Sequence, residues 1–196
     1  MRKYHDHLEP GHFYHIYNHA IGSENLFREN KNYSFFLNKW EKYLLSYSDV
    51  WAYCLMPNHF HFLLEIKDKT FFPKRINENR FLENQFKRLF SSYTLSFNKV
   101  YERRGSLFQK SFKRVKIDSE RYLKHLIHYI HHNPIHHNFT EDYTDWKYSS
   151  YASITGSKPT KLKRKKMLEL FNGKESFTTY HDEMKNYNMI SHLLIE

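Results

Sequence analysis

The chain carries two histidines one residue apart, His59 and His61, within a short apolar run. Alternate residues of a strand point to the same face, so on a strand these two imidazoles would lie side by side. Imidazole is a common ligand of divalent metals, and a strand is a rigid base for a site whose other ligands come from elsewhere. The pair therefore indicates a metal site. Two histidines on the solvated face of a half-buried strand would give the same pattern.

A tyrosine and an asparagine, Tyr129 and Asn133, stand four residues apart in a stretch whose apolar spacing predicts a helix. A helix turns by about 100° per residue, so the two side chains lie about 40° apart on one edge, beside the core-facing arc. A phenol and an amide placed there would point into a crevice between the helix and a sheet. A core role for Tyr129 and a turn-opening role for Asn133 before Pro134 are the plain alternatives.

Basic residues outnumber acidic ones, 31 to 21, which gives a net charge of +10 and a pI near 9.5. This balance predicts a polyanionic partner. The excess is concentrated in residues 84–117, where nine basic residues and the single acid Glu102 leave a net +8. The aromatic residues between them follow helical spacing and are expected in the core. The candidate phosphate contacts in this segment are Lys87, Arg88, Arg103, Arg104, Lys110, Lys113 and Arg114.

The chain is 196 residues long, which suits one domain with a tail. Its single cysteine, Cys54, excludes an internal disulfide framework and a cysteine-rich zinc cluster, and is expected to be a small buried residue. No apolar stretch approaches the roughly 20 residues needed to cross a bilayer, and the first residues are too polar for a signal peptide. A cytoplasmic protein that does not enter a membrane is therefore expected.

Apolar periodicity and turn residues predict alternating strands and helices. Strands are expected at residues 11–20, 50–55 and 60–66, helices at 30–47 and about 82–103, and a strand or irregular basic ribbon at 107–117. Gly105 is placed to end the long helix. The helix that carries Tyr129 should begin after Asp118 or Ser119 and run to about His132, because the residue before Pro134 resists the α conformation.

The C-terminal part, from about Gly156, has its own composition. Six basic residues and no acid occupy residues 158–166, and the pattern predicts a short basic helix followed by a second helix at about 174–187. A solvated charge run and a surface that holds DNA or covers the active site are both compatible with it.

Three segments together resemble the single-tyrosine HUH transposases, and within them the REP-associated tyrosine transposases. The segments are Leu-Met-Pro-Asn-His-Phe-His at 55–61, Arg-Gly-Ser-Leu-Phe-Gln-Lys-Ser-Phe-Lys at 104–113 and Tyr-Ile-His-His-Asn-Pro at 129–134. They occur in the family's order and spacing, over about residues 11–154. The resemblance implies an α/β (α+β) fold for residues 1–155, with a ferredoxin-like antiparallel sheet flanked by helices. A small, basic helical extension would follow at 156–196.

The resemblance also implies a function for individual residues. His59 and His61 match the paired metal ligands, Asn133 matches the amide that completes the metal site, and Tyr129 matches the nucleophile. The implied metal is Mg²⁺ or Mn²⁺, and the implied substrate is single-stranded DNA beside a hairpin. Tyr129 would form a 5′-phosphotyrosine and release a 3′-hydroxyl, which gives endonuclease and strand-transfer activity in transposition. The family contains monomers and homodimers, so both states stay open.

Two features depart from the family pattern. Asn18-His19-Ala20 stands where many relatives have Asn-Arg-Gly, so a phosphate contact by that arginine is in doubt. The helix of Tyr129 is rich in histidine, at positions 125, 128, 131 and 132. His131 and His132, with His136 and His137 after the proline, could be solvated, bind adventitious metal or touch DNA. A solvated state is expected first, since a histidine cluster without fixed partner geometry is weak evidence for a site.

Three other functions compete with the transposase. A zinc hydrolase would suit the imidazoles, but the in-phase carboxylate Glu65 would lie roughly 13 Å away along the strand. A domesticated, catalytically weak DNA-binding regulator would keep the fold, although the intact set of His59, His61, Tyr129 and Asn133 argues against decay. An RNA-binding sheet of the RRM type would need exposed aromatic residues on neighbouring strands, and the chain lacks the corresponding signature.

Overall fold

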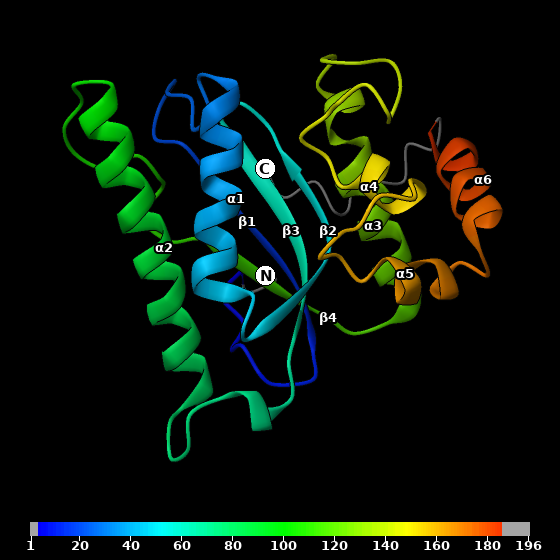
Figure 1. Cartoon of the computed structure of the whole chain (residues 1–196), viewed down its shortest axis with the longest axis horizontal. Coiled ribbons are helices and arrows are strands. Elements are labelled where there is room, and N and C mark those ends of the chain that lie inside the picture. The colour runs from blue at the N-terminus through cyan, green and yellow to red at the C-terminus, as the bar shows by residue number, and fades with distance from the viewer. Residues whose placement is uncertain (1–3, 186–196) are drawn as a thin grey trace.

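A computed structural model of the chain describes residues 4–185. Its first part has the element order β1 (Phe13–His19), α1 (Asn30–Leu44), β2 (Ser48–Leu55), β3 (His59–Ile66), α2 (Glu78–Val100) and β4 (Lys113–Ile117), with a short 3-10 turn η1 (Lys69–Phe71) before α2. The strands form one sheet in the order β2-β3-β1-β4, and every neighbouring pair is antiparallel. This βαββαβ order confirms the expected ferredoxin-like fold (Figure 1).

Strand β3 lies between β2 and β1 in the sheet, and a hydrophobic core covers each of its two faces. Phe60, Phe62 and Leu64 point to the core beneath α1 and α2, whereas Leu63 belongs to a second core on the opposite face. The alternation places His59 and His61 on the Leu63 side, and they are only 2% and 1% exposed. The alternative of a solvated histidine face on a half-buried strand is therefore wrong.

The first core fills the space between the sheet and the two long helices. Trp40 of α1 stacks on Phe62 with ring centroids 3.6 Å apart. Phe86, Tyr93 and Phe97 line the inner side of α2 at helical spacing and are buried. The aromatic residues of the basic segment therefore pack in the core, as their spacing predicted.

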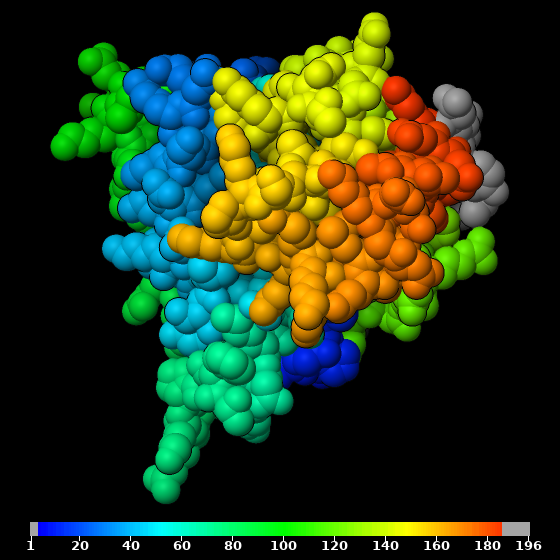
Figure 2. Space-filling view, turned by 45° about the vertical axis from the view of Figure 1, so that its right-hand side comes forward, coloured from blue at the N-terminus to red at the C-terminus, as the bar shows by residue number. Residues whose placement is uncertain are grey.

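The second core joins the sheet to the helices of the C-terminal half. These are α3 (Glu120–His136), α4 (Tyr151–Thr155), α5 (Arg164–Leu170) and α6 (Lys174–Met184). Leu126 and Ile130 of α3 lie in one buried cluster with Met167 of α5 and Phe177 of α6. Figure 2 shows α4, α5 and α6 gathered on one face of the molecule, in yellow to red. The boundary expected at residue 155 stays a prediction, and the two parts share this core.

Several expected boundaries differ from the structure for local reasons. Helix α2 ends at Val100, before Gly105, because Glu102 already takes a left-handed backbone with φ of 50°. Pro134 does not stop α3, which continues to His136. A proline in the last turn removes one helical hydrogen bond, and the His137 amide still donates to the Asn133 carbonyl at 3.1 Å.

The other predicted helices and strands agree with the structure in part. Ser119 caps α3 by accepting a hydrogen bond from the Tyr122 amide, as one of the two expected caps. Only residues 113–117 of the expected ribbon form a strand, and α4 was not expected. Helix α6 ends at Met184, and the expected end at Tyr187 lies outside the described residues.

In residues 4–185, every helix is too short or too polar to span a bilayer.

The first core predicts a large cost for replacing Phe62 by alanine. Removing the ring that stacks on Trp40 leaves a cavity, so the free energy of unfolding should fall by about 3–5 kcal/mol. Urea unfolding of both proteins measures the difference. Leu95→Ala is the control, because Leu95 is 71% exposed and should cost no more than about 0.5 kcal/mol. Equal effects of the two substitutions would contradict this description of the core.

Candidate functional site

Strand β3 places the two histidines of the sequence motif in one buried layer. The rings of His59 and His61 lie with centroids 5.1 Å apart and at 80° to each other. The turn before the strand is closed by the Met56 amide, which donates to the His59 carbonyl at 2.8 Å. His59 therefore begins β3 directly at the turn, with its side chain held at the end of the strand.

Helix α3 brings the other two candidate residues to this layer. The Oδ1 atom of Asn133 lies 2.9 Å from Nε2 of His59. One turn earlier, the Tyr129 ring stands edge-on to His61 with centroids 5.3 Å apart. Asn133 is fully buried and Tyr129 is 2% exposed. The structure thus brings His59, His61, Tyr129 and Asn133 together, at the interface between helix and sheet where their spacing suggested.

Strand β1 supplies a neighbouring layer that the sequence analysis missed. His19 pairs with His59 across the strands, and their rings stack at 4.7 Å. The Nε2 atom of His15 lies 2.9 Å from Nδ1 of His61, and Tyr17 stacks on the same ring at 5.6 Å. The alternate spacing of residues 15, 17 and 19 on a predicted strand was the available signal. That spacing places the three side chains on one face of the strand, but it does not show which strand lies beside them.

The buried imidazoles are held in their neutral form. Burial lowers the pKa of His61 well below its usual value, and the neighbouring imidazoles of His15 and His59 lower it further. Burial alone lowers the pKa of His15 to about 3. A metal ligand must present a lone pair, so a neutral His61 is ready to coordinate without first losing a proton.

The donor atoms fit a small divalent cation. Nδ1 of His59 lies 2.8 Å from Oδ1 of Asn58, and in the tautomer that donates its proton there the lone pair on Nε2 faces the Asn133 oxygen. These two atoms are 2.9 Å apart, and two ligands at a right angle around an octahedral Mg²⁺ are about 3 Å apart. Nε2 of His61 is buried without a hydrogen-bond partner among residues 4–185.

The ligand set would be unusual for a structural metal. Within the described part of the chain, no group of three or more His, Cys, Asp or Glu side chains is placed to hold a metal ion. The candidate site therefore depends on two imidazoles and one amide oxygen. Such a set leaves coordination positions for water or phosphate oxygens, as Mg²⁺ commonly requires.

His131 and His132 are buried, so the expectation that they are solvated is wrong, whereas His136 is exposed. His128 and His131 are fully buried and His132 is 9% exposed, because α4 and α6 cover this side of α3. His131 bonds on one side to His181 of α6 at 2.9 Å and on the other to Ser150 at 2.8 Å. These histidines connect α3 to the C-terminal helices. His125 remains partly exposed.

The candidate phosphate contacts fall into two groups. Lys87, Arg88, Arg104 and Lys110 are exposed. The other three, Arg103, Lys113 and Arg114, are half-buried. A cleft of about 890 Å³ between α2 and residues 105–112 is lined by Lys87, Lys110 and Arg114, on the side of the sheet opposite Tyr129. Lys113 lies on the side of Tyr129, since its strand partner is Tyr17.

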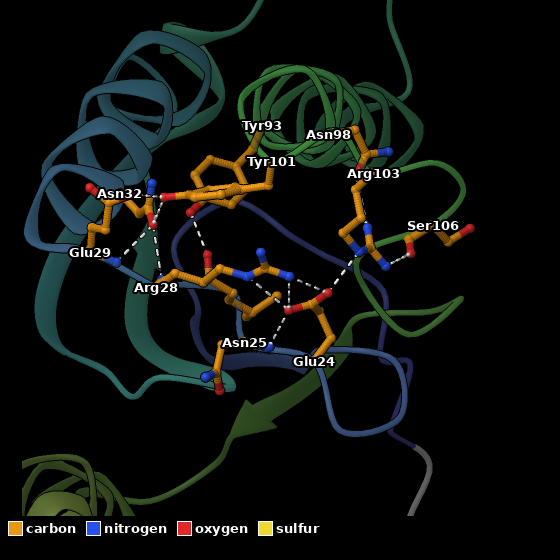
Figure 3. Close-up of polar contacts among 11 residues, drawn as sticks. Glu24, Asn25, Arg28, Glu29, Asn32, Tyr93, Asn98, Tyr101, Arg103 and Ser106 are labelled. Atoms are coloured by element: carbon orange, nitrogen blue, oxygen red, sulfur yellow. Dashed lines mark hydrogen bonds and ion pairs between the residues drawn. The ribbon is translucent and has the colours of Figure 1, made fainter.

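Two of these arginines make internal contacts. Arg103 pairs with Glu24 at 2.7 Å and donates to Asn98 and to the Ser106 carbonyl (Figure 3). Arg114 pairs with Glu83 of α2. Their guanidinium groups therefore position the chain around the cleft.

The contacts of Arg103 belong to a polar network that fixes the loop after β1 to the end of α2 (Figure 3). The Tyr93 hydroxyl donates to the Leu26 carbonyl at 2.6 Å, and the Tyr101 hydroxyl donates to Glu29 at 2.7 Å. The Gln109 amide donates to the His19 carbonyl at 2.9 Å. Residues 101–109 are thereby held against the end of β1, next to the histidine layer.

Comparisons with known proteins agree with the motifs. No family model matches the chain. Over 103 residues it is 30% identical to a Haemophilus influenzae protein provisionally named a REP-associated tyrosine transposase, and the match covers 51% of this chain but only 57% of that relative. A solved structure of a REP-associated tyrosine transposase bound to a REP hairpin has a TM-score of 0.58 at 16% identity, over 78% of this chain and 84% of the other. The resemblance stated from the motifs is confirmed, and the fold is shared.

The buried histidine contacts predict that acid destabilises the protein. Burial lowers the pKa of His181 to about 4, below the value of about 6.5 for an unfolded histidine. The unfolded state then takes up more protons, so stability that is present above about pH 6.5 is lost as the pH falls toward 4. Between pH 7 and pH 5, His181→Phe should lose about 1–2 kcal/mol less stability than the wild type.

Urea unfolding at pH 7, 6 and 5 measures these slopes. His136→Phe is the control, because His136 is exposed at the end of α3. Its slope should match the wild type. An unchanged slope in His181→Phe would show that His181 does not remain neutral in the folded chain.

Proposed function

We propose that the chain is a REP-associated tyrosine transposase that cleaves and rejoins single-stranded DNA beside hairpins, with Tyr129 as the nucleophile. The observation that carries the proposal is the meeting of His59 and Asn133, which are 74 residues apart in sequence, in the buried layer that also contains His61 and Tyr129. The names of the similar proteins support a substrate of hairpin DNA.

Tyr129 would attack the phosphorus of the scissile phosphate through its phenolic oxygen. A bond forms between this oxygen and phosphorus, and the bond from phosphorus to the 3′ oxygen breaks. The phenolic proton leaves to solvent, the 3′ oxygen takes up a proton, and the products are a 5′-phosphotyrosine and a free 3′-hydroxyl. A 3′-hydroxyl of the same or another strand reverses these steps. Because the phosphodiester energy is retained, joining needs no ATP.

The residues around Tyr129 suit this attack. A phenol has a pKa near 10, so at neutral pH it needs a polarised phosphate or a local base. Mg²⁺ or Mn²⁺, held by His59, His61 and Asn133, supplies Lewis-acid polarisation of the non-bridging phosphate oxygens when bound. As ligands, the two imidazoles and the amide are neutral, so they add no negative charge beside the phosphate. The edge contact with His61 holds the Tyr129 ring next to the ligands.

Two features of the site bear on how cleavage would proceed: its burial and its location within one chain. Tyr129 is 2% exposed, so a phosphate reaches its hydroxyl only after the side chains that shield it move. The proposed nucleophile and its three proposed ligands come together within a single chain, so a monomer can form the complete set. The proposal is therefore compatible with a monomer, and a homodimer is not required by the geometry.

Three lysines, two exposed and one half-buried, supply the proposed contacts with DNA. Lys87 and Lys110 line the cleft beside α2, whereas Lys113 lies on the side of the sheet that carries Tyr129. A DNA strand bound both in the cleft and at Lys113 would pass around β4, which is the edge strand of the sheet, to reach the layer of Tyr129. Such contacts to phosphates set position and affinity without reading sequence.

The rival functions are less well supported by the geometry. Glu65, the only in-phase carboxylate weighed for a zinc hydrolase, accepts a hydrogen bond from the Trp51 indole at 3.0 Å and is engaged there. A sheet of the RRM type presents bare aromatic residues to RNA, whereas α3 covers this sheet. A catalytically weak DNA-binding regulator keeps every feature except turnover, so a covalent assay separates it from the transposase.

The covalent step gives the most specific prediction. With Mg²⁺ or Mn²⁺ and end-labelled single strands that carry candidate hairpins, the wild type should form a protein-DNA adduct that survives denaturant. Tyr129→Phe should form none, because it lacks the attacking oxygen. Tyr122→Phe, on the same helix, is the matched control and should retain the adduct. An adduct with Tyr129→Phe would refute the nucleophile, and binding without any adduct in the wild type would favour the regulator.

The basic cleft predicts the salt dependence of DNA binding. Lys87→Ala and Lys110→Ala each remove one proposed phosphate ligand, so both should weaken DNA binding at low salt. Each should also reduce the slope of log K against log salt by about 0.7–0.9. Fluorescence anisotropy with a labelled hairpin at several salt concentrations measures both quantities. Lys69→Ala is the control, since Lys69 is an exposed lysine of η1 before the other end of α2. Slopes that match the wild type would exclude the cleft as the DNA surface.

A further inference from the structure

His15 is a buried histidine that none of the motifs includes. It lies on β1, is 5% exposed, and its Nε2 atom is 2.9 Å from Nδ1 of His61. The His15 ring lies at 25° to the His61 ring with centroids 5.1 Å apart, and it meets the Tyr129 ring edge-on at 6.1 Å. His15 therefore contacts both a candidate metal ligand and the candidate nucleophile.

The direction of the hydrogen bond between the two imidazoles decides what His61 can do. A neutral imidazole carries one N–H, so only one of the two rings donates. If His61 donates through Nδ1, its Nε2 keeps a lone pair that can bind a cation. If His15 donates, the proton of His61 stays on Nε2. Since Nε2 has no hydrogen-bond partner within residues 4–185, that proton would be a buried donor without an acceptor.

We propose that His15 is a positioning residue, which accepts the Nδ1 proton of His61 and so presents the Nε2 lone pair to the divalent ion. The inference rests on the proposed function, because it gives His61 the role of a ligand. Asn58 makes the equivalent contact with Nδ1 of His59 at 2.8 Å, so both ligand rings have an acceptor behind them. Such outer contacts fix the tautomer and raise the basicity of a ligating histidine.

The tautomer of His61 tests the inference without any metal. In the metal-free wild type, ¹⁵N NMR of the histidine side chains, assigned with His61→Gln, should show the proton of His61 on Nδ1. In His15→Phe, which keeps a ring but removes the acceptor, the proton should shift toward Nε2. A proton on Nε2 of His61 in the wild type would overturn the inference, whatever the variant does.

Metal affinity provides the second readout. Titration with Mn²⁺, followed by the electron paramagnetic resonance of the free ion, should show 10- to 100-fold weaker binding in His15→Phe. In His15→Gln a side-chain amide oxygen can again accept the proton, so affinity should recover to within about threefold of the wild type. The matched control is His181→Phe, which breaks another buried histidine pair of the same 2.9 Å length and should bind Mn²⁺ normally.

The outcomes separate this inference from the proposed function. If the wild type binds Mn²⁺ and His15→Phe binds it equally well, the positioning role is wrong and the proposed function stands. If the wild type binds no Mn²⁺, the metal part of the proposed function fails, and the tautomer of metal-free His61 still decides the role of His15. If His15→Phe does not fold, the wild-type tautomer and the affinity of His15→Gln carry the test.

Discussion

The contact between His59 on β3 and Asn133 on α3 is the constraint on which the candidate site depends. At 2.9 Å it fixes how α3 is rotated against the sheet. With Asn133 in this position, Tyr129 one turn earlier can only lie over His61, two residues further along β3. Asn133 meets His59 and Tyr129 meets His61, so two residues one helical turn apart face two residues that alternate along the strand. The layer of candidate site residues follows from matching these two periodicities.

Keeping that contact requires strong packing on both sides of β3. The strand sends Phe60, Phe62 and Leu64 into the core of α1 and α2, which leaves its other face for the histidines. Helix α3 is held over them by the second core, to which α5 and α6 contribute. The hydrogen bond between His131 and His181 adds a buried polar contact, and burial lowers the pKa of both rings. The C-terminal helices thus support the element that carries the candidate nucleophile, Tyr129.

Much of this arrangement was predictable from the sequence, because it depends on local periodicity. The strands around residues 11–20 and 60–66, the long amphipathic helix, and the shared edge of Tyr129 and Asn133 follow from spacing alone. The role of His15 was not predictable, because it requires the register of β1 against β3. The burial of the α3 histidines requires knowing that α4 and α6 cover them, and the contacts of Arg103 and Arg114 require knowing where Glu24 and Glu83 lie.

Anomalous scattering from Mn²⁺ in crystals of the protein tests the central claim most directly, because it locates the ion independently of activity. The account predicts one strong peak within bonding distance of Nε2 of His59, Nε2 of His61 and Oδ1 of Asn133, on the side that faces Tyr129. A peak bound by other residues, or no peak at saturating Mn²⁺ while the 2.9 Å contact between His59 and Asn133 stays intact, would contradict it.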